Sequence, residues 1–244
     1  MLRFFSKIRY KLAAENKIAK YLRYAIGEIL LVVIGIIIAL QVSNWNTERV
    51  LRHKEVVYLK SLKKSLEQDL ENEIIPAIEY HEKGLMCFDT LLTMFFQSES
   101  WIPKDSIQKW NITYGSLRLF QTSFNTVAFE NIKSIGIDFI SNDSLREEIS
   151  TLYGYDYEWI DQITAQLHTS LEERFFIVWD REVGNIFQLT DEEWNILRKN
   201  SQLHVMLIGI QGKLNNINYY MELAQQKVEN LISDLDNEIE HLDD

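Results

Sequence analysis

The chain has 244 residues, a formal net charge of -11 and a single cysteine, Cys87. The acidic charge argues against a nucleic-acid partner, because binding to phosphates requires clustered Lys and Arg. The single cysteine excludes a disulfide within the chain. About 200 residues follow an apolar N-terminal segment, and a chain of this length can bury one hydrophobic core without disulfides or metal.

Residues 1–23 form a basic head, with seven Lys or Arg and one acid, Glu15. Positive residues before an apolar segment stay on the cytoplasmic side of a bacterial inner membrane. The apolar side chains of residues 1–13 recur three or four apart, which fits a helix on an anionic membrane surface or an unstructured basic stretch. We therefore expect the N-terminus to be cytoplasmic.

Residues 25–42 are almost entirely apolar, and Glu28 and Gln41 are the only strongly polar side chains among them. At a helical rise of about 1.5 Å per residue, this segment is roughly 27 Å long and matches the hydrocarbon core of a bilayer. The apolar core is longer than that of a cleavable signal peptide. We predict a single-pass anchor at 24–46 that places residues 47–244 outside the cytoplasm as one helical domain.

Aromatic and polar side chains mark this predicted anchor. Tyr21 and Tyr24 at one end and Trp45 at the other are positioned as interfacial anchors. Glu28 is the intramembrane ionisable residue, and two interpretations stay open. It could pair with a partner subunit, or it could extend toward the headgroups near Arg23.

A row of small residues on one face of the same helix suggests self-association. Gly27, Gly35 and Ala39 are separated by multiples of four, and Gly35 with Ala39 makes a small-xxx-small pair that lets two helices approach closely. The hypothesis is a homodimer through the membrane helix. The alternative is that glycine is simply common in membrane helices.

Beyond the anchor, helical periodicity dominates. Apolar residues from Leu59 to Ile78 recur at helical spacing, which predicts a long amphipathic helix to Phe96 with a possible kink at Pro76. Residues 97–123 contain Pro103, Gly115 and several Ser and Thr, and this composition indicates loops around short helices.

Further helices are predicted in the second half of the chain. Residues 124–135 read as a helix that stops at Gly136, and 141–143 offer N-caps for a helix that runs to about Arg181. Thr190 and Glu193 have capping-box spacing for a short helix to Lys199, and 203–242 form a final long helix. The predicted fold class is all-α, an N-terminal transmembrane helix followed by an antiparallel helical bundle.

The sequence offers no motif for catalysis or for a cofactor. It contains neither a Gly-x-Ser-x-Gly elbow nor a glycine-rich phosphate loop, so we expect no enzyme activity and no catalytic, cofactor-binding or metal-binding residues. One acidic stripe on a predicted helix could bind a cation, although a solvated face explains it better. Its members are Glu158, Asp161, His168 and Glu172.

Tryptophans are frequent in the predicted domain, and they could line a ligand pocket or fill the core. Core packing is the simpler explanation, because large aromatic side chains dominate burial in helical domains. The residues concerned are Trp101, Trp110, Trp159, Trp179 and Trp194.

Three stretches resemble an uncharacterised family of bacterial single-pass membrane proteins, the domain-of-unknown-function family 6090. They are ENKIAKYLRYAIGEILLVVIGIIIALQVSNWN at 15–46, AFENIKSIG at 128–136 and ISNDSLREEI at 140–149. The resemblance implies a membrane anchor on a helical domain without known catalytic residues. We expect a module that contacts a lipid bilayer and an unknown protein partner. The alternatives are a small-molecule sensory domain that acts through a separate output protein, or an enzyme.

Overall fold

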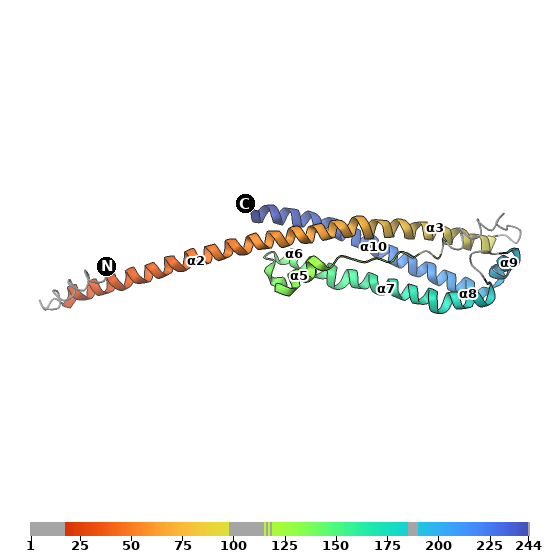
Figure 1. Ribbon diagram of the computed structural model, residues 1–244, viewed down its shortest axis with the longest axis horizontal. Coiled ribbons are helices and arrows are strands. Elements are labelled where there is room, and N and C mark those ends of the chain that lie inside the picture. Colours follow the sequence, from red (N-terminus) through yellow and green to blue (C-terminus); the bar gives the residue numbers. More distant parts are fainter. Residues whose placement is uncertain (1–17, 98–114, 116, 118, 185–189, 244) are drawn as a thin grey trace. The chain divides into compact units, whose positions relative to one another are not determined.

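The structure, a computed structural model, describes residues 18–97, 115, 117, 119–184 and 190–243 (Figure 1). These residues divide into two compact units, which meet in sequence between Lys54 and Glu55. Throughout the described ranges the regular structure is helical and contains no strand, so the predicted all-α class is confirmed.

The first unit is the N-terminal part of helix α2 (Ile18–Asp69). Apolar side chains such as Leu31 and Ile38 are exposed there, at 66% and 58% of their surface. An 18-residue window of this helix is long and apolar enough to cross a membrane, and none of it is buried within the protein. Because apolar helix faces normally require cover, this helix is a candidate membrane span.

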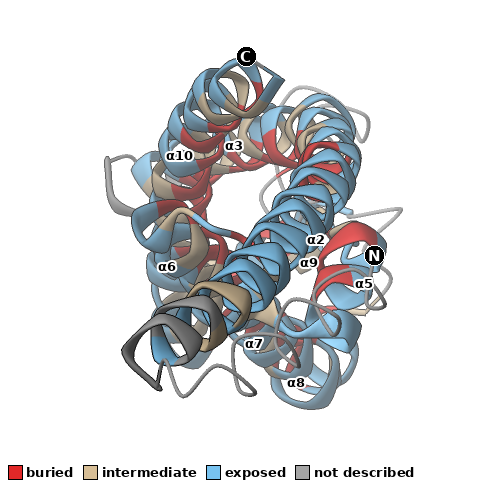
Figure 2. Cartoon of the chain, turned by 90° about the vertical axis from the view of Figure 1, so that its left-hand side faces the viewer, coloured by how far each residue is buried: buried red, intermediate tan, exposed pale blue. Residues whose placement is uncertain are grey.

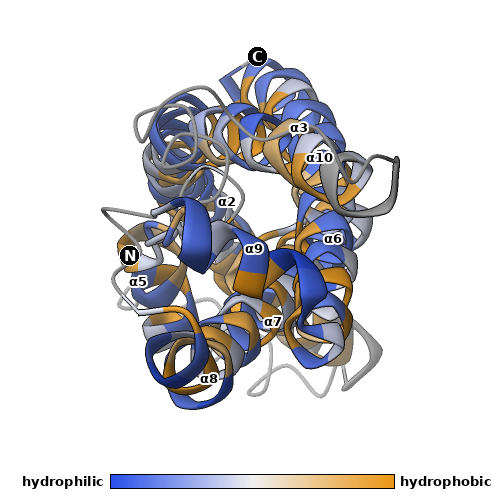
Figure 3. Cartoon of the chain, turned by 90° about the vertical axis from the view of Figure 1, so that its right-hand side faces the viewer, coloured by the Kyte–Doolittle hydropathy of each residue, from blue (hydrophilic) through white to orange (hydrophobic). Residues whose placement is uncertain are grey.

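The second unit is a bundle built from the end of α2 and from α3 (Ile75–Gln97), α7 (Tyr157–Ser170) and α10 (Ser201–Asp243). Helix α10 packs antiparallel to α3 and α7 (Figure 1). Buried residues occupy the helix sides that face one another (Figure 2), and these sides are also the hydrophobic ones (Figure 3). The bundle therefore follows from the amphipathic patterns of its helices.

Three π-helical segments interrupt the long helices: η1 (Leu70–Ile74), η3 (Leu152–Asp156) and η4 (Leu171–Phe175). The first explains the expected irregularity near Pro76. Proline has no N–H, and its ring crowds the carbonyl four residues earlier, so the helix widens just before it. The long helix predicted to end near Arg181 instead consists of α6 (Asp143–Thr151), η3, α7, η4 and α8 (Phe176–Glu182).

Helix ends follow the predicted capping chemistry. The Asn142 side chain accepts the Leu145 N–H at the start of α6, at 3.2 Å. Thr190 and Glu193 form a capping box at α9 (Asp191–Lys199). Helix α5 (Val127–Ile135) ends at Gly136, whose φ of 102° favours glycine, and a short 3-10 turn, η2 (Ile137–Phe139), follows.

Helix α5 begins three residues later than the prediction, because residues 124–126 lie outside the helix and Thr126 is its N-cap. Among the tryptophans, Trp179 and Trp194 are completely buried and Trp159 packs partly buried against the same core, which confirms a packing role for these three. Trp101 and Trp110 lie outside the described residues, as does most of the predicted loop region 97–123.

Candidate functional site

The residues predicted for membrane-helix packing all lie on α2. A Cβ atom added at Gly27 or Gly35 would meet nothing within 4 Å, so contacts within the chain do not require glycine there. Ala39 is exposed on the same helix. These positions are therefore available to a contact outside the chain, and self-association stays a prediction.

The other predicted membrane residues are also on α2. Trp45 is 65% exposed, whereas the side chain of Glu28 is half-buried. Tyr21 and Tyr24 belong to the helix, but their side chains lie outside the described part. No described contact distinguishes the two interpretations of Glu28.

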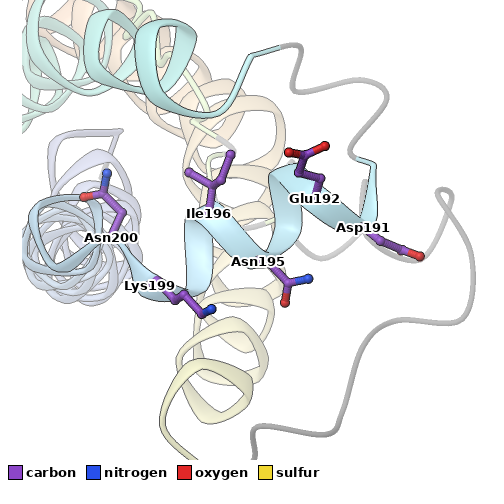
Figure 4. A pocket seen from close by; sticks show the side chains of 6 residues that line it. All are labelled: Asp191, Glu192, Asn195, Ile196, Lys199 and Asn200. Atoms are coloured by element: carbon purple, nitrogen blue, oxygen red, sulfur yellow. The ribbon is translucent and has the colours of Figure 1, made fainter.

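A broad hollow lies along α9, where Figure 4 shows six lining residues. All of them come from α9 and the residue that follows it: Asp191, Glu192, Asn195, Ile196, Lys199 and Asn200. Side chains along one helix diverge from one another, and a ligand site needs polar groups that converge from several elements. The hollow therefore makes a poor candidate.

A smaller pocket of about 330 Å³ lies between α6, η3 and α10. Its polar lining includes the carboxylates of Glu147, Glu148 and Asp156. Lys227 of α10 donates to both Asp156 oxygens, at 2.6 and 2.7 Å, so one of the three carboxylates is already paired. The pocket retains an acidic rim with a volume suited to a small ligand.

The most organised polar arrangement surrounds residues 119–125, which we call the strap segment. This segment is extended and contains no helix, and its side chains alternate between exposed Gln121 and Ser123 and the more buried Phe120, Thr122 and Phe124. Such alternation is the geometry of an extended chain with one face against a core. The strap segment lies directly before α5.

Ionisable side chains of one helical stretch hold the strap segment through its backbone. The N–H of Asn125 donates to Asp69 Oδ1 at 2.7 Å, the N–H of Ser123 to Glu73 Oε2 at 2.9 Å, and the N–H of Phe120 to His81 Nε2 at 3.4 Å. Residue numbers therefore rise along the helix as those of their partners fall along the strap segment, so the two segments run antiparallel.

Asp69, one of the three side chains that hold the strap segment, has a buried carboxyl group with a shifted pKa. It is 2% exposed, and its Oδ2 atom has no hydrogen-bond partner among the described residues. Burial raises its pKa from 3.8 to about 6, although the hydrogen bond from Asn125 and the nearby Tyr157 hydroxyl oppose the rise, while Glu73 adds to it. The hydroxyl makes no well-formed hydrogen bond with any described group. At neutral pH the protein therefore buries a carboxylate with incomplete solvation.

The pKa of His81 is shifted in the opposite direction, below its usual value. The side chain is fully buried, and burial lowers its pKa from 6.5 to about 4. An Nε2 atom that accepts a hydrogen bond places the ring proton on Nδ1, and Nδ1 has no partner in the described structure. The hydrogen bond from the N–H of Phe120 therefore requires the neutral ring.

Aromatic stacking closes the inner side of this arrangement. The rings of Phe124 and Tyr157 stack with centroids 3.8 Å apart, and Phe129 stacks on Tyr153 at 4.5 Å. Tyr153 and Tyr157 belong to or border η3, so the π-helical segments η1 and η3 both flank Asp69. Segments of this kind are frequent at functional sites.

The sequence does not indicate that Asp69, Glu73 and His81 hold another segment of the chain. All three belong to a predicted amphipathic helix, where acids such as Asp69 and Glu73 resemble ordinary surface charges. The detectable signal was the interruption of the apolar stripe by polar residues that face inward. Their partners are backbone groups about 40 to 55 residues away, which no local pattern specifies.

The acidic stripe expected on α7 is solvated. Glu158, Asp161, His168 and Glu172 are all exposed. Across the described ranges, no three His, Cys, Asp or Glu side chains are grouped so that they could hold a metal ion.

Fold and geometry together define a class: an all-α protein with a long apolar N-terminal helix and an acidic bundle in which ionisable side chains hold an extended segment. Residues 28–83 match a family described as "Family of unknown function (DUF6090)". The expected resemblance is confirmed over this segment, which also contains Asp69, Glu73 and His81. The matches at 128–136 and 140–149 stay predictions. No curated protein and no solved structure matches the chain.

Proposed function

We propose that this chain is a single-pass inner-membrane protein with a cytoplasmic N-terminus, whose acidic helical bundle acts outside the cytoplasm by binding a partner. The observation that carries the proposal is the apolar part of α2, where side chains such as Leu30 and Ile34 are more than half exposed. A helix this apolar is stable when lipid covers it, and the seven basic residues before it favour this orientation.

Carbonate extraction of membranes tests the anchor. The full chain is expected to stay in the membrane pellet, whereas a double variant, Ile34→Lys with Ile37→Lys, is expected in the soluble fraction, because each central Lys costs about 3 kcal/mol of insertion free energy. The matched control places Lys at two exposed apolar positions of the bundle, Val127 and Ile177, and should pellet like the wild type. A soluble wild-type chain would refute the anchor.

The outer face of α10 supports a role in contact. From Val205 to Tyr219, the positions opposite the core are exposed and uncharged: Val205, Ile208, Gly209, Gly212, Asn215, Asn216 and Tyr219. A Cβ atom at either glycine would meet nothing within 4 Å, although each glycine costs an exposed helix about 1 kcal/mol relative to alanine. An uncharged, flat face on an acidic bundle is suited to packing against another helix.

Site-specific photocrosslinking in intact cells tests contact through this face. A photoreactive residue at Ile208 is expected to give one adduct of defined mass, and the same residue at exposed Asp180 on α8 should give none. Equal labelling at both positions, or none at Ile208, would remove α10 as the contact surface.

Small-molecule sensing is the second candidate, and the acidic pocket between α6, η3 and α10 is the observation that favours it. The carboxylates of Glu147 and Glu148, which make no ion pair in the described structure, would select a small cationic ligand. A panel of amines should then raise the Tm of the wild-type chain and leave the double variant Glu147→Gln with Glu148→Gln unchanged. If no amine shifts the Tm of the wild type, binding of a partner by the bundle is favoured as the function.

A further inference from the structure

The strap segment is attached in an unusual way. Within the described residues, none of its backbone groups bonds to another backbone group, and its N–H groups at Phe120, Ser123 and Asn125 are held by side chains alone. A helix or sheet shares its hydrogen bonds among many neighbours, so it opens cooperatively. A segment held by separate side chains can detach in a smaller step.

Polar atoms without partners are concentrated beneath this segment. Asp69 Oδ2, His81 Nδ1 and the Tyr157 hydroxyl are buried and lack a hydrogen-bond partner among the described groups. Each such atom destabilises the closed arrangement, because water would solvate it if the segment moved away. Opening of the strap segment therefore restores the hydration of these three atoms.

The charges around Asp69 add to this effect. Glu73 lies on the same helical stretch as Asp69, and η3 or its border carries Tyr153, Asp156 and Tyr157. Asp161 of α7 lies near Thr122 of the strap segment. The cation of α10 on this side, Lys227, is paired with Asp156. In the described structure neither Asp69 nor Glu73 makes an ion pair with Lys or Arg. The buried carboxylate thus gains its solvation from opening and not from a counter-ion.

We propose that the strap segment, residues 119–125, is a gate that opens while the helices of the bundle stay folded, and that each opening exposes Asp69, Tyr157 and the rings of Phe120 and Phe124. The open form presents a carboxylate, a phenol group and apolar rings to solvent. The proposal is independent of the function proposed above.

Hydrogen exchange of the full chain in detergent micelles, read by mass spectrometry, tests the gate. A peptide that covers 119–126 should exchange by a route that does not depend on urea at low concentrations, because the opening exposes little surface. A peptide from the buried part of α10, around Leu214, should exchange only by a route that urea accelerates. If both peptides show the same urea dependence, the strap segment opens only when the bundle unfolds, and the proposal is wrong.

Asp69→Asn provides the second test, because asparagine keeps the acceptor for the N–H of Asn125 and removes the buried charge. The rise in the pKa of Asp69 from 3.8 to about 6 corresponds to a preference for the neutral side chain on the order of 100-fold when the segment is closed. Exchange of the 119–126 peptide at neutral pH should slow by up to this factor.

The matched control, Asp180→Asn, changes an exposed acid on α8 and should leave exchange of the peptide at the wild-type rate. Faster or unchanged exchange in Asp69→Asn, in a protein whose α10 peptide is protected as in the wild type, would show that the buried charge does not drive opening. That result would overturn the proposal.

Discussion

Asp69 and His81 should make opposite contributions to the pH dependence of stability. The pKa of Asp69 is raised by burial to about 6, so the folded state binds more protons than the unfolded state between pH 3.8 and 6. Its favourable contribution is present below pH 3.8 and is lost as the pH rises through 6. The pKa of His81 is lowered by burial to about 4, so its contribution is present above pH 6.5 and is lost as the pH falls toward 4.

The two effects are similar in size. At 1.36 kcal/mol per pH unit, each shift corresponds to at most about 3 kcal/mol, and screening by solvent at the exposed edge of the strap segment reduces this to about 2 kcal/mol. Because the signs are opposite, these two groups together leave the wild type almost insensitive to pH between 4 and 6.5. A variant at either position should therefore reveal the contribution of the other.

Urea unfolding of the full chain in detergent micelles, followed by circular dichroism, measures the effect. Asp69→Asn should match the wild type at pH 4 and exceed its free energy of unfolding by about 2 kcal/mol at pH 7. His81→Gln, whose amide oxygen can still accept the N–H of Phe120, should lose about 2 kcal/mol less at pH 4 than at pH 7. If the difference between Asp69→Asn and the wild type is the same at both pH values, the reasoning about the buried carboxylate is refuted.

Other substitutions test the membrane helix, a helix cap and the core. Gly35→Ile should lower the signal of a membrane two-hybrid assay for self-association, and an unchanged signal would count against a homodimer through this face. Asn142→Ala removes the cap of α6 and the 2.6 Å hydrogen bond to Glu238, so the free energy of unfolding should fall by about 1 to 2 kcal/mol, and an unshifted urea midpoint would contradict this. Trp179→Ala empties a fully buried position and should cost about 3 to 5 kcal/mol, which thermal unfolding would detect as a much lower Tm; a loss under 1 kcal/mol would be inconsistent with its burial.

Local rules were enough to predict most of the helices. The capping box at Thr190 and Glu193 and the stop at Gly136 depend on residues within a few positions of one another, so their chemistry can be read directly from the sequence. The long final helix follows from apolar residues at helical spacing and is observed as α10. The fold class was predictable for the same reason.

The strap segment was not predictable, because its structure depends on partners far away in sequence. Phe124 and Asn125 belong to the predicted helix 124–135, yet they are not helical, since the N–H of Asn125 bonds to Asp69 and the ring of Phe124 stacks on Tyr157. The π-helical segments η3 and η4 likewise lack a local signal such as proline. Tertiary contacts override local preference at these places.

The proposed function requires both the membrane anchor and its orientation. Cysteine labelling in spheroplasts tests both directly, in a Cys87→Ser background with one new cysteine at Val127, an exposed position of α5 away from the proposed contact face of α10. A membrane-impermeant maleimide should label Val127→Cys before lysis, because the bundle faces outward. Labelling only after lysis would place the bundle in the cytoplasm and contradict the proposed topology.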